Sequence, residues 1–144
     1  MTAPTATVPA TEATTTSATT ILRRVLVLDA LVTGGNGVIY LIASGPVAEL
    51  LGTSAGLLLG IGTFLAAYGL AVGVLAAQRK PSASMTKLVI GANLLWALVS
   101  IGVAAFGVLG TNVIGTTWTV LQAGTVAGFA ALQMWGLRKL RTRH

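Results

Sequence analysis

Asp29 is the one acidic residue inside a long apolar run of this sequence. Thr33, Asn36 and Tyr40 follow it at i+4, i+7 and i+11, a spacing that puts all four side chains on one face of a helix. A carboxyl group held in hydrocarbon is costly and often marks a functional site, where it can bind a proton or a cation. It can equally anchor a helix by pairing with a basic side chain. Both interpretations of Asp29 stay open on the sequence alone.

Other polar residues inside apolar runs fall at two depths when they are counted by helical rise. The expected inner layer consists of Asp29, Asn93 and Gln133. The expected central layer consists of Asn36, Ser100, Gln122 and Thr125. Tyr68 is expected between the two layers. These residues form the candidate intramembrane polar site.

The same residues have a structural interpretation. Hydrogen bonds between membrane helices contribute about 0.6 kcal/mol each on average, so polar side chains also hold bundles together. We favour this interpretation for the Asn, Gln, Ser and Thr residues. For Asp29 the alternative to proton or cation binding is an ion pair with Arg23, Arg24 or Lys87. Trp96 and Trp118 are interpreted as packing or interface residues.

The apolar runs that carry these residues are long enough to be membrane spans. The chain is 54% hydrophobic and 8% charged, whereas soluble domains carry about 25% charged residues. A span needs about 20 apolar residues. Four spans are predicted, over Ile21 to Ala43, Ser54 to Gln78, Thr86 to Leu109, and Thr111 to Leu137. The predicted fold class is therefore an all-α bundle of four antiparallel transmembrane helices.

The distribution of basic residues predicts the topology. All nine Lys and Arg residues lie at the start of the first span, between the second span and the start of the third, or after the fourth. By the positive-inside rule both termini are expected in the cytoplasm, and the protein in the plasma membrane. The net charge of +6 is therefore interpreted as facing lipid headgroups, not nucleic acid. The lipid bilayer is the expected partner, with a second copy of the chain or another membrane protein as further candidates.

Residues 1–20 are rich in Thr and Ala and are predicted to be a disordered cytoplasmic tail, and residues 138–144 a basic cytoplasmic tail. Val47 to Leu51 is expected to form one helical turn at the outer surface. Ser54 is a candidate cap for the second span. A tight turn at Gly110 makes the last two spans antiparallel neighbours.

Glycines in the spans indicate where helices can pack closely. Gly34, Gly35 and Gly37 interrupt the first span, either for close helix packing or as a hinge beside Asn36. Small-residue pairs such as Gly69 and Gly73 favour tight contacts within the bundle or a dimer.

An internal duplication of the sequence is a further hypothesis, with chance similarity as the competing explanation. In such a duplication Arg23, Asp29 and Asn36 would correspond to Lys87, Asn93 and Ser100. The segment 64–68 would correspond to the segment 129–133.

Three segments carry a resemblance, Leu28 to Gly37, Ala92 to Ser100, and Leu121 to Ala130. In them the chain resembles uncharacterised small four-span integral membrane proteins of actinobacteria. The resemblance implies four helices and a plasma-membrane location, and it carries no activity. By size the chain is also similar to the small multidrug-resistance transporters, which use an acidic residue in their first span. Those transporters use a Glu deeper in the helix and often have little charge bias, unlike this chain.

Three functional hypotheses remain. The first is a non-enzymatic subunit or scaffold. The second is a small proton- or cation-coupled transporter in which Asp29 is the coupling group and Asn36, Tyr40, Tyr68, Asn93 and Gln122 line the path. An intramembrane enzyme is disfavoured because the chain has no Cys and its single His is the last residue. For the same reason no cofactor or metal is expected. A carrier needs a water-accessible cavity that reaches Asp29, whereas a scaffold needs a dry core and an exposed small-residue face.

Overall fold

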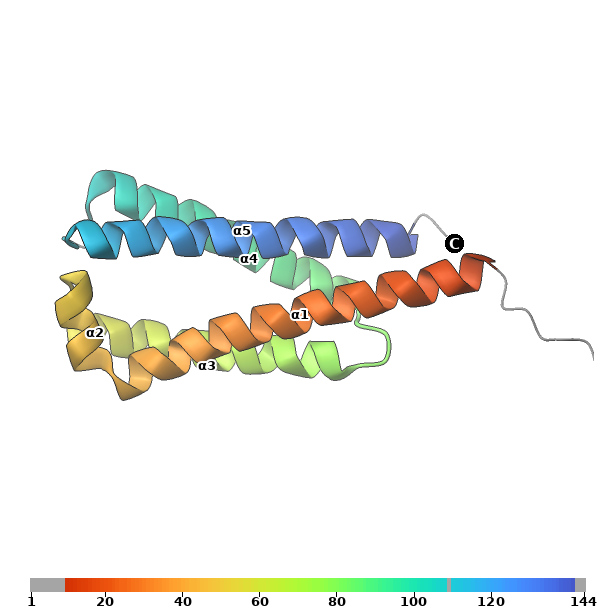
Figure 1. Ribbon diagram of the computed structural model, residues 1–144, viewed down its shortest axis with the longest axis horizontal. Coiled ribbons are helices and arrows are strands. Elements are labelled where there is room, and N and C mark those ends of the chain that lie inside the picture. Colours follow the sequence, from red (N-terminus) through yellow and green to blue (C-terminus); the bar gives the residue numbers. More distant parts are fainter. Residues whose placement is uncertain (1–9, 109, 142–144) are drawn as a thin grey trace, which may run out of the picture.

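The fold consists of four long helices and one short one. The computed structural model describes residues 10–108 and 110–141 (Figure 1). In chain order the helices are α1 (Ala10–Ile42), α2 (Ser44–Leu51), α3 (Ala55–Ala77), α4 (Ala83–Phe106) and α5 (Val113–Arg141). The described residues contain no strand. The predicted all-α class is confirmed.

All four long helices are long and apolar enough to cross a membrane. Large apolar side chains point away from the bundle, and Leu70 and Leu98 are 72% and 70% exposed. In water this surface would be strongly unfavourable, whereas in a bilayer it faces lipid tails. The chain is therefore an integral membrane protein of four spans. Their bounds are Ser17–Ile42, Ala55–Ala77, Ala83–Phe106 and Val113–Leu140.

Helix α1 begins at Ala10, eleven residues before the expected start at Ile21. The expected disorder is therefore not met for residues 10–20, and residues 1–9 lie outside the described residues. Ala18, near the end of this extension, is buried. Once Leu22 is packed in the core, adding helical turns in front of it avoids the cost of nucleation. Likewise α5 continues to Arg141, so part of the expected basic tail is helical, and residues 142–144 lie outside the described residues.

The long helices pack as two antiparallel hairpins (Figure 1). Helix α1 packs along α3, and α4 packs along α5. The hairpins meet where α1 contacts α5, whereas α3 and α4 make the weakest contact although a short turn joins them. The order around the bundle is therefore α3, α1, α5, α4, and the backbones of α3 and α4 approach each other least.

Glycines bring α1 and α3 into backbone contact. A Cβ atom built at Gly37 would lie 2.5 Å from the backbone nitrogen of Ala66, and one at Gly69 would lie 2.6 Å from Cα of Gly34. Only glycine allows this approach, which gains dispersion contacts along both helices. Helix α1 is continuous through this segment, so the glycines pack and do not unwind the helix. By contrast, Gly35 on the same helix has open space around it.

Helix α2 closes one end of the bundle. It is a full short helix of eight residues, longer than the single expected turn. Gly52 ends it with φ of 73°, in the left-handed region that favours glycine. The side chain of Asn112, in the turn before α5, donates to the carbonyl of Leu50 at 3.0 Å. As predicted, Ser54 caps the next helix by accepting from the amide of Leu57 at 3.2 Å.

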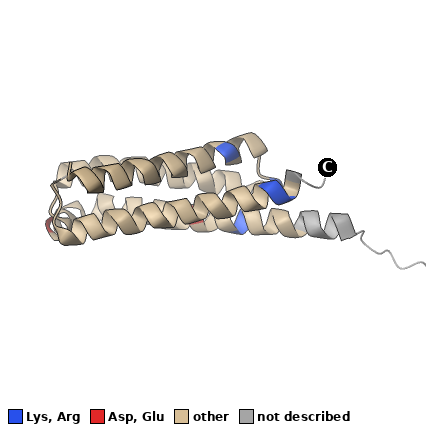
Figure 2. Ribbon diagram, turned by 90° about the horizontal axis from the view of Figure 1, so that it is seen from above, with Lys and Arg blue, Asp and Glu red and all other residues tan. Residues whose placement is uncertain are grey.

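The opposite end of the bundle carries the basic residues (Figure 2). Lys87 and Arg138 lie near the ends of α4 and α5, and Arg23 lies inside α1, bonded to the carbonyl of Ala76 at the end of α3. Glu49 lies in α2 at the other end. We call the half of the bundle at the basic end the basic half and the half that α2 closes the α2 half.

Candidate functional site

A hydrogen-bonded cluster surrounds Asp29 in the basic half. The Asp29 side chain is fully buried, at 0% exposure. One of its carboxylate oxygens accepts from the amides of Asn93 and Gln133, each at 2.7 Å. Its other oxygen accepts from the Thr33 hydroxyl at 3.0 Å. The structure therefore brings together all three residues expected in the inner layer and joins three different helices through them.

The side-chain amide atoms of Asn93 and Gln133 are all paired. The Asn93 amide nitrogen also donates to the Gln133 side-chain oxygen at 3.2 Å. The Asn93 side-chain oxygen accepts from the Tyr68 hydroxyl at 3.3 Å. That hydroxyl also lies 3.2 Å from the carbonyl of Val89. Tyr68 thus adds α3, the fourth long helix. We call Asp29, Thr33, Tyr68, Asn93 and Gln133 together the carboxylate cluster.

The donors to the Asp29 carboxylate among the described residues are all neutral. The pairing considered from the sequence, with Arg23, Arg24 or Lys87, is not the arrangement found. The Arg23 guanidinium donates to the carbonyl of Ala76 at 3.1 Å, and Arg24 and Lys87 are exposed. Long basic side chains so close to the membrane surface reach toward the headgroups instead of the core.

The cluster also follows the suspected repeat. Asp29 and Asn93 occupy equivalent places in the two halves of the sequence and bond directly to each other. Tyr68 and Gln133, the second equivalent pair, both bond to Asn93. Parallel repeats related by an axis along the membrane normal would bring equivalent residues together in this way.

The expected central layer does not form a cluster. Thr125 donates to the carbonyl of Leu121 in its own helix at 2.9 Å. Gln122 donates to the Tyr40 hydroxyl at 3.0 Å. The side chains of Asn36 and Ser100 make no hydrogen bond to the described residues. Asn36 lies in one hairpin and the other three residues lie in the other, and no hydrogen bond links any two of the four.

Tyr40 connects the two hairpins in the α2 half. Its hydroxyl accepts from the indole nitrogen of Trp118 at 2.7 Å and from the Gln122 amide. The Tyr40 side chain is 4% exposed. The sequence interpretation treated Trp118 as a packing or interface residue and missed this bond. The bond could have been suspected because Trp118 and Gln122 lie one helical turn apart on the same face of α5.

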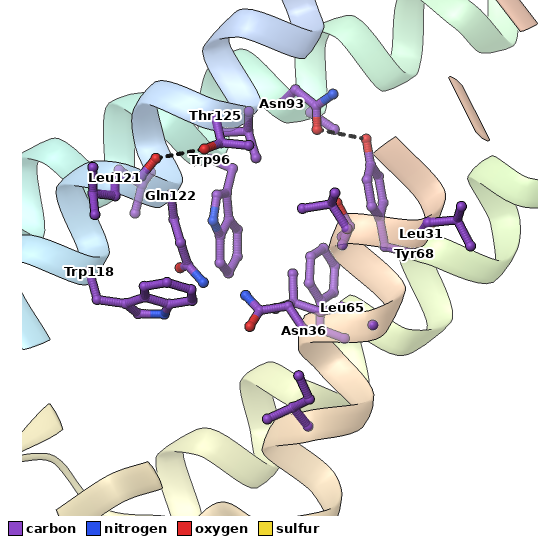
Figure 3. Close-up of a pocket in the computed structure, with 18 of the residues that line it drawn as sticks. Leu31, Asn36, Leu65, Tyr68, Asn93, Trp96, Trp118, Leu121, Gln122 and Thr125 are labelled. Atoms are coloured by element: carbon purple, nitrogen blue, oxygen red, sulfur yellow. Dashed lines mark hydrogen bonds between the residues drawn. The ribbon is translucent and has the colours of Figure 1, made fainter. Parts of the chain in front are cut away.

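A pocket of about 650 Å³ lies between the hairpins (Figure 3). Its volume is within the range of about 300–1,000 Å³ that is typical of small-molecule sites. Most of its lining is apolar or aromatic, and Phe64, Trp96 and Trp118 contribute rings to it. Five residues of the candidate intramembrane polar site also line it, Asn36, Tyr68, Asn93, Gln122 and Thr125. Asp29, Tyr40, Ser100 and Gln133 do not line it.

The carboxylate cluster forms one boundary of this pocket. Thr33, Tyr68 and Asn93 belong to the cluster and also line the pocket. Asp29 lies behind them, fully buried. The pocket therefore touches the partners of the carboxylate but stops short of the carboxylate itself.

Phe64 and Trp96 are site residues that the sequence interpretation missed. The Phe64 ring stacks on Tyr68 with centroids 6.0 Å apart and on Trp96 with centroids 5.7 Å apart. Phe64 and Tyr68 are one helical turn apart and could have been paired from their spacing. The third ring comes from another helix, and spacing within one helix carries no information about it.

The site defines an integral membrane protein of four spans with an intramembrane pocket beside a buried carboxylate. No protein family, curated protein or solved structure matches this chain in the comparisons made. Its function must therefore be inferred from the pocket and the cluster. Within the described residues, no three His, Cys, Asp or Glu side chains lie together as metal ligands would.

Proposed function

We propose that this protein is a non-enzymatic scaffold of the plasma membrane that holds a lipid-soluble molecule between its two helical hairpins. The observation that carries the proposal is the pocket of about 650 Å³ beside the weakly packed edge between α3 and α4. The lining is partly open to the bilayer, since Leu31, Leu95 and Leu121 are 59–66% exposed, so a lipid-soluble molecule can enter the pocket from the membrane.

Two features support binding without catalysis. The chain has no Cys, and its only His is the terminal residue, so the common nucleophile and base pairs cannot form in the pocket. The Asp29 oxygens are engaged by three donors and are not exposed to the pocket. The group best suited to acid–base chemistry is thus committed to holding three helices together.

The proposal includes the orientation in the membrane. The basic residues at one end favour a cytoplasmic location for that end, by the positive-inside rule. Both termini would then be cytoplasmic, and α2 would lie at the outer surface. The pocket would reach from the carboxylate cluster through the middle of the bilayer into its outer part.

The test is to purify the protein from its native membrane in mild detergent and to identify bound molecules by mass spectrometry. Two matched variants sharpen it. Gly35→Leu fills the pocket, because Gly35 lines it and a Cβ there meets nothing within 4 Å. Gly91→Leu is the control, because Gly91 also has open space but does not line the pocket.

We expect one small molecule to accompany the wild type and Gly91→Leu and to be lost from Gly35→Leu. Retention of the same molecule by Gly35→Leu would place it elsewhere and contradict the proposal. If instead a stoichiometric protein partner is found and is lost from Gly35→Leu, the occupant of the pocket is a helix of that partner and not a small molecule.

A second candidate is a proton- or cation-coupled transporter that uses Asp29. The observation that favours it is the contact of Thr33, Tyr68 and Asn93 with both the carboxylate cluster and the pocket. A ligand in the pocket could then sense the protonation of Asp29 through these side chains. Asp29→Asn distinguishes the two candidates. A transporter would lose the pH dependence of ligand binding in this variant, whereas the scaffold would bind the ligand as before.

A further inference from the structure

The lining of the pocket excludes a charged ligand. Every residue that lines it is uncharged. The nearest carboxylate, Asp29, is fully buried behind Thr33 and Asn93 and already accepts three hydrogen bonds. An ion in such a site would lose its hydration without gaining a counter-charge, which costs several kcal/mol. This lining therefore fits a neutral ligand best.

The aromatic part of the lining is suited to a flat ring. Tyr68, Phe64 and Trp96 stack in series with interplanar angles of 17° and 12°, so their three ring planes are nearly parallel. Trp96 and Trp118 enter the pocket from α4 and α5 (Figure 3). A planar ligand ring can stack or meet these rings edge to face, which adds about 0.5–1.5 kcal/mol per pair to apolar burial.

Two amides can bind oxygen atoms of such a ring. The amides of Asn36 and Gln122 point into the pocket from opposite hairpins (Figure 3). Asn36 makes no hydrogen bond to the described residues, and Gln122 uses only its amide nitrogen, toward Tyr40. An amide offers both a donor and an acceptor. It can therefore bind a carbonyl oxygen or a hydroxyl group of the ligand.

We propose that the ligand is a neutral lipid of the quinone and quinol class, with its oxygen-bearing ring held between the pocket aromatics and the amides of Asn36 and Gln122. Its apolar tail reaches the bilayer along the exposed part of the lining, where Leu31, Leu95 and Leu121 are 59–66% exposed. This inference rests on the proposed function, because it names the chemical class of the molecule in the same pocket.

The three tryptophans provide a site-specific probe. Trp96 and Trp118 line the pocket, whereas Trp135 lies outside it with the Lys139 ammonium 4.8 Å from its ring. Trp135→Phe keeps only the pocket tryptophans, and the double variant Trp96→Phe, Trp118→Phe keeps only Trp135. Each protein, in phosphatidylcholine and phosphatidylglycerol nanodiscs, is titrated with a decyl-substituted 1,4-naphthoquinone while tryptophan fluorescence is recorded.

We expect quenching in Trp135→Phe that saturates at one quinone per protein. In the double variant we expect only the gradual quenching that follows partition of the quinone into the bilayer. Equal, unsaturable quenching in both proteins would overturn the inference. Asn36→Leu in the Trp135→Phe background should weaken the saturable binding about tenfold, the loss expected for one hydrogen bond. Unchanged affinity there would overturn the role of the amide.

The failure of this inference can be told apart from failure of the proposed function. Dioleoylglycerol, a neutral lipid without a ring, is titrated in the same way in place of the quinone while the shift of the pocket tryptophan emission is recorded, and Gly35→Leu serves as the narrowed pocket. If dioleoylglycerol binds to the wild type but not to Gly35→Leu, and the quinone does not bind, the pocket function stands and the quinone class is wrong. If neither lipid distinguishes Gly35→Leu from the wild type, both proposals are wrong.

Discussion

The two halves of this bundle use polar residues in opposite ways. In the basic half, Asp29, Asn93 and Gln133 satisfy one another across three helices. In the α2 half, Asn36 and Gln122 face a pocket and leave hydrogen-bonding capacity unused. A polar group in hydrocarbon is costly unless it is paired. The paired set is therefore explained by holding the helices together, and the unpaired set calls for a ligand.

The first prediction removes the centre of the paired half. Asp29→Leu would leave the amide donors of Asn93 and Gln133 without their acceptor, and an unsatisfied buried donor costs about 1–3 kcal/mol. We expect a loss of about 2–4 kcal/mol in the free energy of unfolding, measured by denaturant titration in detergent micelles. Asp29→Asn is the control, because its side-chain oxygen can accept both bonds. Equal losses in the two variants would mean that the charge, not the hydrogen bonds, stabilises the fold.

The second prediction concerns the backbone contact between α1 and α3, which runs through both halves of the bundle. Gly37→Ala would place a methyl group 2.5 Å from the Ala66 nitrogen and force α1 away from α3. Overpacking of this kind costs about 1–3 kcal/mol. Gly35→Ala, two residues away with open space around it, should leave stability unchanged or raise it slightly. The thermal unfolding midpoints of the two variants test the assignment, and a reversed order would contradict it.

The third prediction tests the hydrogen-bonded connection between the hairpins at Tyr40. Tyr40→Phe removes the acceptor of Trp118 and Gln122 while keeping the ring. At about 0.6 kcal/mol per interhelical bond, the expected loss is about 1 kcal/mol. A blue shift in the emission of Trp118, in a Trp96→Phe, Trp135→Phe background, would report the lost hydrogen bond. Unchanged emission and stability would show that this connection does not hold the hairpins together.

Much of the fold and part of the site could be predicted from the sequence. Apolar run length gave the four spans, because the bilayer fixes how long a span must be. Counting helical rise from the basic residues correctly placed Asp29, Asn93 and Gln133 at one depth. Their meeting also required the helices to turn toward one another, which the polar faces themselves predict, since polar side chains avoid lipid.

The pocket could not be predicted in the same way. It exists because α1 packs on α3 through Gly37 and Gly69 while α3 and α4 diverge. With 18 glycines in the chain, composition does not single out those that bring α1 and α3 together, Gly34, Gly37, Gly62 and Gly69. Depth placed Asn36 with Gln122 and Thr125, but whether residues of one depth touch depends on the separation of the helices. That separation is a property of the packed bundle and not of any one span.

The most direct test makes the same substitution in both halves. Asn93→Leu removes side-chain bonds to Asp29, Gln133 and Tyr68, whereas Asn36→Leu removes none within the described residues. The measurement is the free energy of unfolding of both variants of the ligand-free protein, in one detergent. We predict a loss of about 2 kcal/mol or more for Asn93→Leu and a change within about 0.5 kcal/mol for Asn36→Leu. Equal losses would contradict the division into a structural half and a binding half.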